Sequence, residues 1–349
     1  MSRFKFSVGP WNVHSGADSY GPATRNEIAF EEKVKQFAKL GFSAVQFHDD
    51  DVVPNMNDLT NDQIKAEARK VKALLDKFGL KSEFVAPRLW MDPHTIDGAY
   101  MSGSTKDREY ALWRSYRSID IANELGTDMI VLWLAREGTL CAESKSPVES
   151  TRQLIDAINK MLAYDPKIRI VIEPKPNEPV DRSICGTMGH AMAVSAATID
   201  PARVGGNVES AHAILAGLDP SHEMGFALAM GKLWTVHLND QNGLKFDQDK
   251  SFGVENLRQA FNQIRLLVEN DYGSHGEYIG LDVKAMRTTS DADSYKHLEN
   301  SLKVVRALEA KVEKFDTAFQ QKCIEQRDYE GLEMYVMNLL MGIDNQASI

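Results

Sequence analysis

A carboxylate and an ammonium group follow one apolar run near the middle of this 349-residue chain. The run is the β-branched segment 170–172, which leads into Glu173 and, after a proline, Lys175. It predicts a buried parallel strand, and residues two apart on an extended backbone point to the same side. Glu173 and Lys175 would then leave the strand end together, where one can hold a metal ion while the other polarises a substrate oxygen. The alternative is a structural salt bridge.

Other acids and imidazoles follow the later apolar runs. Glu209 and His212 are three residues apart, a spacing that brings two side chains to one face of a helical turn. Asp247 and Asp249 alternate in the loop after the next run, so they also face one side. The predicted ligands at the strand ends are Glu173, Glu209, His212, His237, Asp247, Asp249 and Asp282.

Five carboxylates at one mouth would repel one another unless cations lay among them. Oxygen-dominated ligation with one or two imidazoles suits Mn²⁺, Mg²⁺ or Co²⁺ better than a structural zinc ion. The residue types therefore predict two divalent cations. Taken singly, each residue has an ordinary alternative, because surface acids are commoner than ligands and most lone histidines are structural. Their shared location favours the metal interpretation.

Short apolar runs alternate with helical patterns along most of the chain. The helical patterns of residues 31–40 and 107–125 stop at Gly41 and Gly126, as helices commonly do. Eight such alternations at this length favour a closed (β/α)₈ TIM barrel over an open doubly wound sheet. No GxGxxG motif follows the first strand, so no nucleotide cofactor is expected. The predicted strands span residues 6–11, 44–47, 83–86, 129–133, 168–172, 203–209, 233–238 and 278–283.

We assign residues 1–312 to the barrel, which carries the catalysis, and residues 313–349 to a C-terminal helical extension. The extension is helical in pattern but has too few apolar residues for a core of its own. Such a tail is either frayed or laid on a neighbouring subunit. We expect the second, a subunit contact in a homotetramer or homodimer.

Composition excludes several classes of protein. A net charge of −10 argues against affinity for nucleic acid. The first residues contain no apolar run long enough for a signal peptide, and no apolar run approaches the length of a membrane span, so no membrane partner is expected. Three widely spaced cysteines form no CxxC pair and suggest reduced thiols. A cytoplasmic enzyme is the expectation.

The sequence resembles the D-xylose (glucose) isomerase family, in its shorter, actinobacterial type. The resemblance runs in order from near the N-terminus to the end of the predicted barrel. Its most specific stretches are residues 173–179 and the pair formed by residues 241–243 and 246–249. The matching residues are Phe47-His48-Asp49-Asp50-Asp51, Trp133 with Arg136-Glu137-Gly138, Glu173-Pro174-Lys175-Pro176-Asn177-Glu178-Pro179, Gly189-His190-Ala191, Gly217-Leu218, Leu238-Asn239 with Gln241-Asn242-Gly243, and Phe246-Asp247-Gln248-Asp249.

The resemblance implies a role for each matching position. His48, oriented by Asp51, would open the cyclic sugar by taking its anomeric proton. Lys175 would hydrogen-bond the carbonyl oxygen while a hydride moves between C1 and C2. Trp11, Trp90 and Trp133 would form the apolar walls, and Tyr20 would enter a neighbouring subunit's pocket. The first metal would be held by Glu173, Glu209 and Asp282, and the second by Glu209, His212, Asp247 and Asp249.

Four positions depart from the family's pattern. His237 stands where the family has an aspartate ligand of the first metal, and Asp240 where it has a glycine. An imidazole removes one negative charge, which weakens the hold on Mg²⁺ and favours Mn²⁺, Co²⁺ or Zn²⁺. His14 and Arg88 add donors near the sugar and alter which hydroxyls are preferred. A set containing His237 resembles instead the metal ligands of rhamnose isomerases and ketose 3-epimerases.

These residues leave three hypotheses. The first is a divalent-metal aldose–ketose isomerase acting on xylose, glucose or a related sugar. The second is a sugar 3-epimerase or a lyase of a sugar derivative on the same scaffold. The third, a barrel endonuclease of the abasic-site type, needs a basic groove that the net charge of −10 disfavours.

Overall fold

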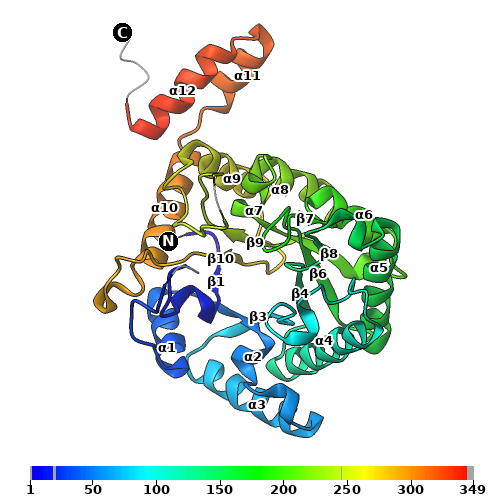
Figure 1. Ribbon diagram of the computed structural model, residues 1–349. Coiled ribbons are helices and arrows are strands. Elements are labelled where there is room, and N and C mark those ends of the chain that lie inside the picture. Colours follow the sequence, from blue (N-terminus) through cyan, green and yellow to red (C-terminus); the bar gives the residue numbers. More distant parts are fainter. Residues whose placement is uncertain (1, 19–20, 245, 344–349) are drawn as a thin grey trace.

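The computed structural model describes residues 2–18, 21–244 and 246–343. Eight parallel strands form a closed barrel in the order β1-β10-β9-β8-β6-β4-β3-β2 (Figure 1). The predicted TIM barrel is confirmed, and a strand lies in each predicted range, but the first one, predicted over residues 6–11, ends at Val8 because a 3₁₀ turn begins at Pro10. The barrel strands are β1 (Phe6–Val8), β2 (Ala44–His48), β3 (Lys81–Ala86), β4 (Met129–Trp133), β6 (Arg169–Glu173), β8 (Val204–Glu209), β9 (Leu233–Leu238) and β10 (Ile279–Leu281).

Helices ring the barrel, and local sequence sets their ends. Helix α3 begins with a capping box, in which Thr60 and Gln63 exchange side-chain and backbone hydrogen bonds. Helices α1 and α4 end where Gly41 (φ 90°) and Gly126 (φ 80°) adopt the left-handed conformation. The helices of the barrel are α1 (Phe30–Leu40), α2 (Asp49–Val52), α3 (Asn61–Lys77), α4 (Thr105–Leu125), α5 (Pro147–Tyr164), α6 (Met188–Ala196), α7 (Ser210–Leu215), α8 (Pro220–Ala229), α9 (Leu257–Glu269) and α10 (Lys296–Val312).

Several short elements were not predicted. A two-stranded antiparallel ribbon pairs β5 (Gly138–Thr139) with β7 (Arg182–Ser183) outside the barrel. Two-residue strands carry no periodicity that a sequence pattern could reveal. The described residues also form the 3₁₀ turns η1 (Pro10–Val13), η2 (Met56–Asp58), η3 (Pro93–Thr95), η4 (Ala142–Ser144), η5 (Pro201–Arg203) and η6 (Asp291–Asp293).

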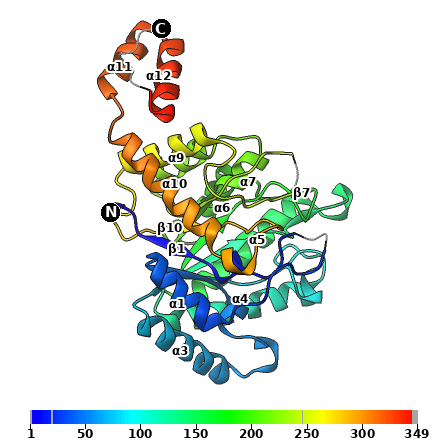
Figure 2. The ribbon, with the colours of Figure 1, turned by 90° about the vertical axis from the view of Figure 1, so that its left-hand side faces the viewer.

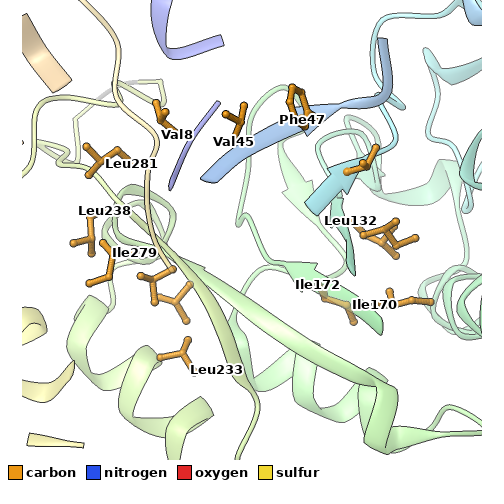
Figure 3. Close-up of a cluster of buried hydrophobic side chains, with 14 of the residues drawn as sticks. Val8, Val45, Phe47, Leu132, Ile170, Ile172, Leu233, Leu238, Ile279 and Leu281 are labelled. Atoms are coloured by element: carbon orange, nitrogen blue, oxygen red, sulfur yellow. The ribbon is translucent and has the colours of Figure 1, made fainter. Parts of the chain in front are cut away.

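The core forms because strand side chains alternate between the helices and the barrel interior. In β6, Ile170 and Ile172 belong to the large apolar cluster between strands and helices, several members of which are drawn in Figure 3. Val171 belongs instead to a smaller cluster with Phe84 and Val131. Burying one such aliphatic side chain contributes roughly 1.5–3 kcal/mol to folding. The same alternation sends Glu173 to the side of Val171, into the mouth of the barrel.

A buried ion pair fixes the turn that follows β2. Asp49 is fully buried and accepts two hydrogen bonds of 2.7 Å from the Nε and Nη2 groups of Arg114 on α4. Ser118 donates a third at 3.1 Å. Because bidentate guanidinium–carboxylate pairs fix orientation, the segment carrying His48 is tied to α4.

Two helices follow α10 and lie apart from the ring of helices in both views (Figures 1 and 2). They are α11 (Thr317–Gln326) and α12 (Tyr329–Met341). Phe315 joins them to the barrel, with ring centroids 6.0 Å from Phe261 of α9 and 5.4 Å from Tyr335 of α12. The expected C-terminal helical extension is therefore present. Within the described ranges, each helix is too short or too polar to traverse a bilayer.

Candidate active site

A cavity of about 610 Å³ opens at the carboxyl ends of the barrel strands. Its walls combine aromatic rings with charged groups. Trp90 and Trp133 pack edge to face at 4.5 Å, and Trp11 lies 4.4 Å from the His48 ring. Every residue predicted from sequence for the site, apart from Asp51 and Tyr20, lines this cavity: Trp11, His14, His48, Arg88, Trp90, Trp133, Glu173, Lys175, Glu209, His212, His237, Asp247, Asp249 and Asp282. Tyr20 lies outside the described residues.

The first group of possible metal ligands surrounds His237. Its Nδ1 lies 3.6 Å from Glu173 Oε2 and 3.8 Å from Glu209 Oε2. Asp282 Oδ2, at the end of β10, is 3.6 Å from the same nitrogen. Six ligands about 2.1 Å from a Mg²⁺ ion lie roughly 3–4 Å from one another. These separations are too long for hydrogen bonds and have the spacing of groups around a shared cation.

The second group shares Glu209 with the first. Glu209 caps α7, and His212 lies in the first turn of that helix, with Nε2 3.3 Å from Glu209 Oε1. The same nitrogen is 3.1 Å from Asp247 Oδ2 in the loop after β9. In each group, the potential ligand atoms of three residues lie within 4.8 Å of one another. These residues are Glu173, Glu209 and His237 in the first group, and Glu209, His212 and Asp247 in the second. Glu209 therefore belongs to both groups.

Several polar atoms of these groups are left without a partner, which fits a metal centre. His212 Nδ1, both nitrogens of His237 and Asp247 Oδ1 are buried and have no hydrogen-bond partner in the described part of the chain. Leaving such groups unpaired costs about 1–3 kcal/mol each. A divalent cation can satisfy donor atoms that the protein itself leaves open, and the mixed oxygen and imidazole set suits Mn²⁺, Mg²⁺ or Co²⁺.

The pKa values of buried groups at this mouth are shifted by neighbouring charges. Burial, reinforced by Asp247, raises the pKa of Glu209 well above its usual range. Burial alone would lower the pKa of His237, but the charge of Glu173 outweighs it and raises that pKa well above its usual range. Both shifts have the direction expected where negative charges are buried close together.

Asp249 lies at the same mouth but outside both ligand groups. Its carboxylate is paired with the ammonium group of Lys284 and also accepts a hydrogen bond of 3.0 Å from Asn239 Nδ2. Asp249 has a positive φ of 43°, a strained conformation for a residue other than glycine. The structure thus places this predicted ligand of the second metal in an ion pair.

Lys175 is buried against the second ligand group. Its Nζ donates to Asp247 Oδ2 at 2.9 Å and to Glu178 Oε2 at 2.7 Å, and lies 5.0 Å from the centre of the Trp133 ring. Burial alone would lower the pKa of Lys175, but the two carboxylates outweigh it and raise the pKa. The side chain is therefore a fixed ammonium donor at the cavity wall.

His48 ends β2 between the rings of Trp11 and Trp90, 5.1 Å from the latter. Asp51 lies beneath it, with Oδ2 3.3 Å from His48 Nδ1. Arg88, from the loop after β3, approaches the same nitrogen at 2.7 Å. The expected pair of His48 and Asp51 is thus brought together, with a guanidinium added to it.

His14 completes the polar wall beside the last strand. Burial, with the cations of Lys284 and Arg25, lowers the pKa of His14 to about 4. At neutral pH the His14 imidazole is therefore uncharged and adds hydrogen-bonding capacity to the cavity without adding charge.

Four supporting residues were missing from the predicted site. Asn207 Nδ2 donates to Glu173 Oε2 at 2.7 Å, and Asn239 Nδ2 donates to Glu209 Oε1 at 2.8 Å. Lys284 and Glu178 pair with Asp249 and Lys175. Asn207 lies two residues before Glu209 on one strand, so the strand period could have identified it.

Asp240, a departure noted in the sequence, takes no part in the ligand groups. It is buried and accepts hydrogen bonds from the backbone N–H groups of Glu255 and Asn256 at 2.8 and 3.0 Å. Its carboxylate ties the loop after β9 to the segment leading into α9.

Comparison with known proteins identifies a family and a similar enzyme. The family described as xylose isomerase-like TIM barrel matches residues 34–289. The xylose isomerase of Thermus thermophilus is 34% identical over 317 residues, covering 89% of this chain and 80% of that protein.

Two solved structures share the fold at low sequence identity. A D-tagatose 3-epimerase-like protein superposes with a TM-score of 0.64 at 17% identity, covering 88% of this chain and 99% of that one. The 3-keto-D-glucoside 4-epimerase of E. coli gives 0.60 at 15% identity, covering 87% and 100%. Because the family match spans most of the barrel and the relative from Thermus aligns along most of its length, this chain belongs to the xylose isomerase-like TIM barrel family.

Proposed function

We propose that the protein is a divalent-metal-dependent aldose–ketose isomerase that converts D-xylose to D-xylulose, D-glucose to D-fructose, or a related pair of sugars. The observation that carries the proposal is the position of Lys175. Asp247 Oδ2 accepts from Lys175 Nζ at 2.9 Å and lies 3.1 Å from His212 Nε2. A fixed ammonium donor therefore adjoins a carboxylate–imidazole group at the wall of a tryptophan-lined cavity.

The residues of the cavity have different roles in the proposed reaction. Glu173, Glu209, His237 and Asp282 would hold one cation, and Glu209, His212 and Asp247 the other. When bound, such cations supply Lewis-acid polarisation of sugar oxygens. Isomerisation moves the C2 hydrogen with its electron pair to C1, while O2 loses a proton and O1 gains one. Lys175 would donate a hydrogen bond to O1 as negative charge develops on that oxygen.

His237 bears on the choice of metal. The resemblance places an aspartate at this position, and an imidazole there removes one negative charge from the first ligand group. Imidazole ligands favour Mn²⁺ or Co²⁺ over Mg²⁺. We therefore propose Mn²⁺ or Co²⁺ as the better activators of this enzyme.

Sugar conversion in D₂O tests the proposal. With Mn²⁺ and D-xylose or D-glucose, we expect the matching ketose to form with little deuterium on carbon, because a hydride shift retains the transferred hydrogen. Chelation of the metal should lower the rate more than about 100-fold. Proton NMR of the products measures both the deuterium on carbon and the rate at which ketose forms. Absence of ketose from every aldose tested would refute the isomerase assignment.

A 3-epimerase is the second candidate, favoured by the presence of His237 in the first ligand group. Epimerisation at C3 removes a proton to the enzyme and returns one, so the C3 position exchanges with solvent. The same NMR experiment with ketose substrates would then show deuterium at C3. The two activities are thus distinguished by the position and amount of the label.

We also propose that α11 and α12 contact a second copy of the chain, in a homodimer or homotetramer. Apolar side chains on these helices are exposed, including Ile324, Met334, Met337 and Met341. Burial of these side chains against a partner would remove apolar surface from water. Light scattering should give a mass of two or four chains, and Met334→Glu combined with Met337→Glu should lower it. A monomeric mass for the unaltered protein would refute this assembly.

A further inference from the structure

The guanidinium of Arg88 restricts the protonation of His48. Arg88 Nη2 lies 2.7 Å from His48 Nδ1, and both residues line the cavity. A guanidinium offers five N–H donors and no acceptor, and it stays charged in proteins. A contact this short therefore requires a lone pair on Nδ1. An imidazole with hydrogen on Nδ1, including the doubly protonated cation, offers none.

Asp51 also approaches His48 Nδ1, but its contact would need a hydrogen on that nitrogen. Its carboxylate would accept a hydrogen from Nδ1, whereas Arg88 must donate one to it. Asp51 Oδ2 is 3.3 Å from Nδ1 and already accepts the backbone N–H of His48 at 2.9 Å. Arg88, at 2.7 Å, makes the shorter contact. The geometry therefore favours the arginine over the aspartate as partner of Nδ1.

Arg88 is itself held in place on two sides. Its Nε donates to Asp50 Oδ1 at 2.7 Å, and its guanidinium lies 5.7 Å from the centre of the Trp90 ring. Asp49, the residue before Asp50, is occupied by Arg114. Asp51 Oδ1 lies 3.5 Å from Arg88 Nη2, so Asp50 makes the shorter of the two carboxylate contacts that orient Arg88.

We propose that Arg88 is a positioning residue that keeps His48 as the Nε2–H tautomer, so that His48 presents a hydrogen-bond donor rather than a base to the bound sugar. The nature of the ligand rests on the proposed function, but the tautomer does not. A substrate oxygen with a free lone pair, such as the ring oxygen, would accept from Nε2. In ring opening, the bond between C1 and the ring oxygen breaks while C1 and the anomeric oxygen O1 form the carbonyl double bond. Water carries the proton from the anomeric hydroxyl to the ring oxygen, and His48 retains its own hydrogen.

Nitrogen-15 NMR of histidine-labelled, metal-free protein at neutral pH tests this proposal without substrate. Chemical shifts distinguish a protonated ring nitrogen from a bare one, and His48→Asn assigns the signals. In the unaltered protein we expect a bare Nδ1 and a protonated Nε2. In Arg88→Met we expect the hydrogen to move to Nδ1, where Asp51 accepts it. Arg88→Lys, which retains a cationic donor, should keep the Nε2–H form.

Asp51→Asn provides a second test that leaves Arg88 in place. Because Arg88 keeps its shorter hydrogen bond to Asp50, the tautomer should not change. Hydrogen on Nδ1 in the unaltered protein, or an unchanged tautomer in Arg88→Met, would overturn the proposal. Since neither sugar nor metal is present, a failed isomerase assay leaves this measurement unaffected.

Discussion

Loss of tightly held divalent cations from both ligand groups is the expected result of Glu209→Ala. Glu209 Oε1 is 3.3 Å from His212 Nε2 and Glu209 Oε2 is 3.8 Å from His237 Nδ1, so one side chain serves both groups. Even residues that only orient a metal ligand change affinity by about 10–100-fold. We expect Mn²⁺ affinity to fall by more than about 100-fold. Metal analysis after dialysis and calorimetric titration measure this loss.

Two further variants separate metal loss from misfolding. Glu209→Gln keeps the size of the side chain but removes its charge, and it should also lose metal. Because a crowded buried carboxylate is removed, the metal-free Glu209→Gln protein should unfold at a denaturant concentration no lower than metal-free unaltered protein. Glu299→Ala, which changes a partly exposed side chain of α10, should bind two cations normally. Retention of two tightly bound cations by Glu209→Ala would show that Glu209 does not bridge them.

Lys175→Met is expected to remove most turnover while preserving metal binding. The substitution keeps an unbranched side chain against Trp133, where a thioether packs favourably. It removes the ammonium group that donates to Asp247. Loss of a single donor to a developing oxyanion typically lowers kcat by about 10²–10³. Steady-state rates with saturating Mn²⁺ measure the effect.

Lys232→Met is the matched control for that change. Lys232 also lies over a tryptophan ring, 5.5 Å from the centre of Trp234, but immediately before β9 at the opposite end of the barrel. It should retain the rate of the unaltered enzyme. If Lys175→Met retained that rate as well, Lys175 would have no part in the reaction.

The barrel could be predicted because its signals are local and repeated. Apolar runs such as segment 170–172 identify strands wherever they fall, and glycines at 41 and 126 end helices for a backbone reason that needs no tertiary context. Glu173 follows from the same rule, since the strand period alone sends it to the interior side of β6. The covalent geometry of an extended backbone makes successive side chains point to opposite faces of the strand.

Pairings between loops could not be predicted in this way. The contact of Arg88 with His48 joins residues 40 apart in sequence, and that of Lys284 with Asp249 depends on two loops after different strands. No periodicity specifies which cation a loop carboxylate will meet. The ion pair of Asp249 with Lys284 is such a contact, and the resemblance, which implies a metal ligand at Asp249, gives no indication of it.

The hydrogen bond from Trp11 Nε1 to Asp282 Oδ1, 2.8 Å long, joins residues 271 apart in sequence, beside the seam where β1 pairs with β10. Bringing the ends of so long a flexible segment together costs about 5 kcal/mol in chain entropy. We therefore expect the seam to form after most other strands have provided a template for it. Trp11 is then an intrinsic fluorophore whose emission should change late in refolding, reporting the moment at which the first and last strands of the cylinder meet.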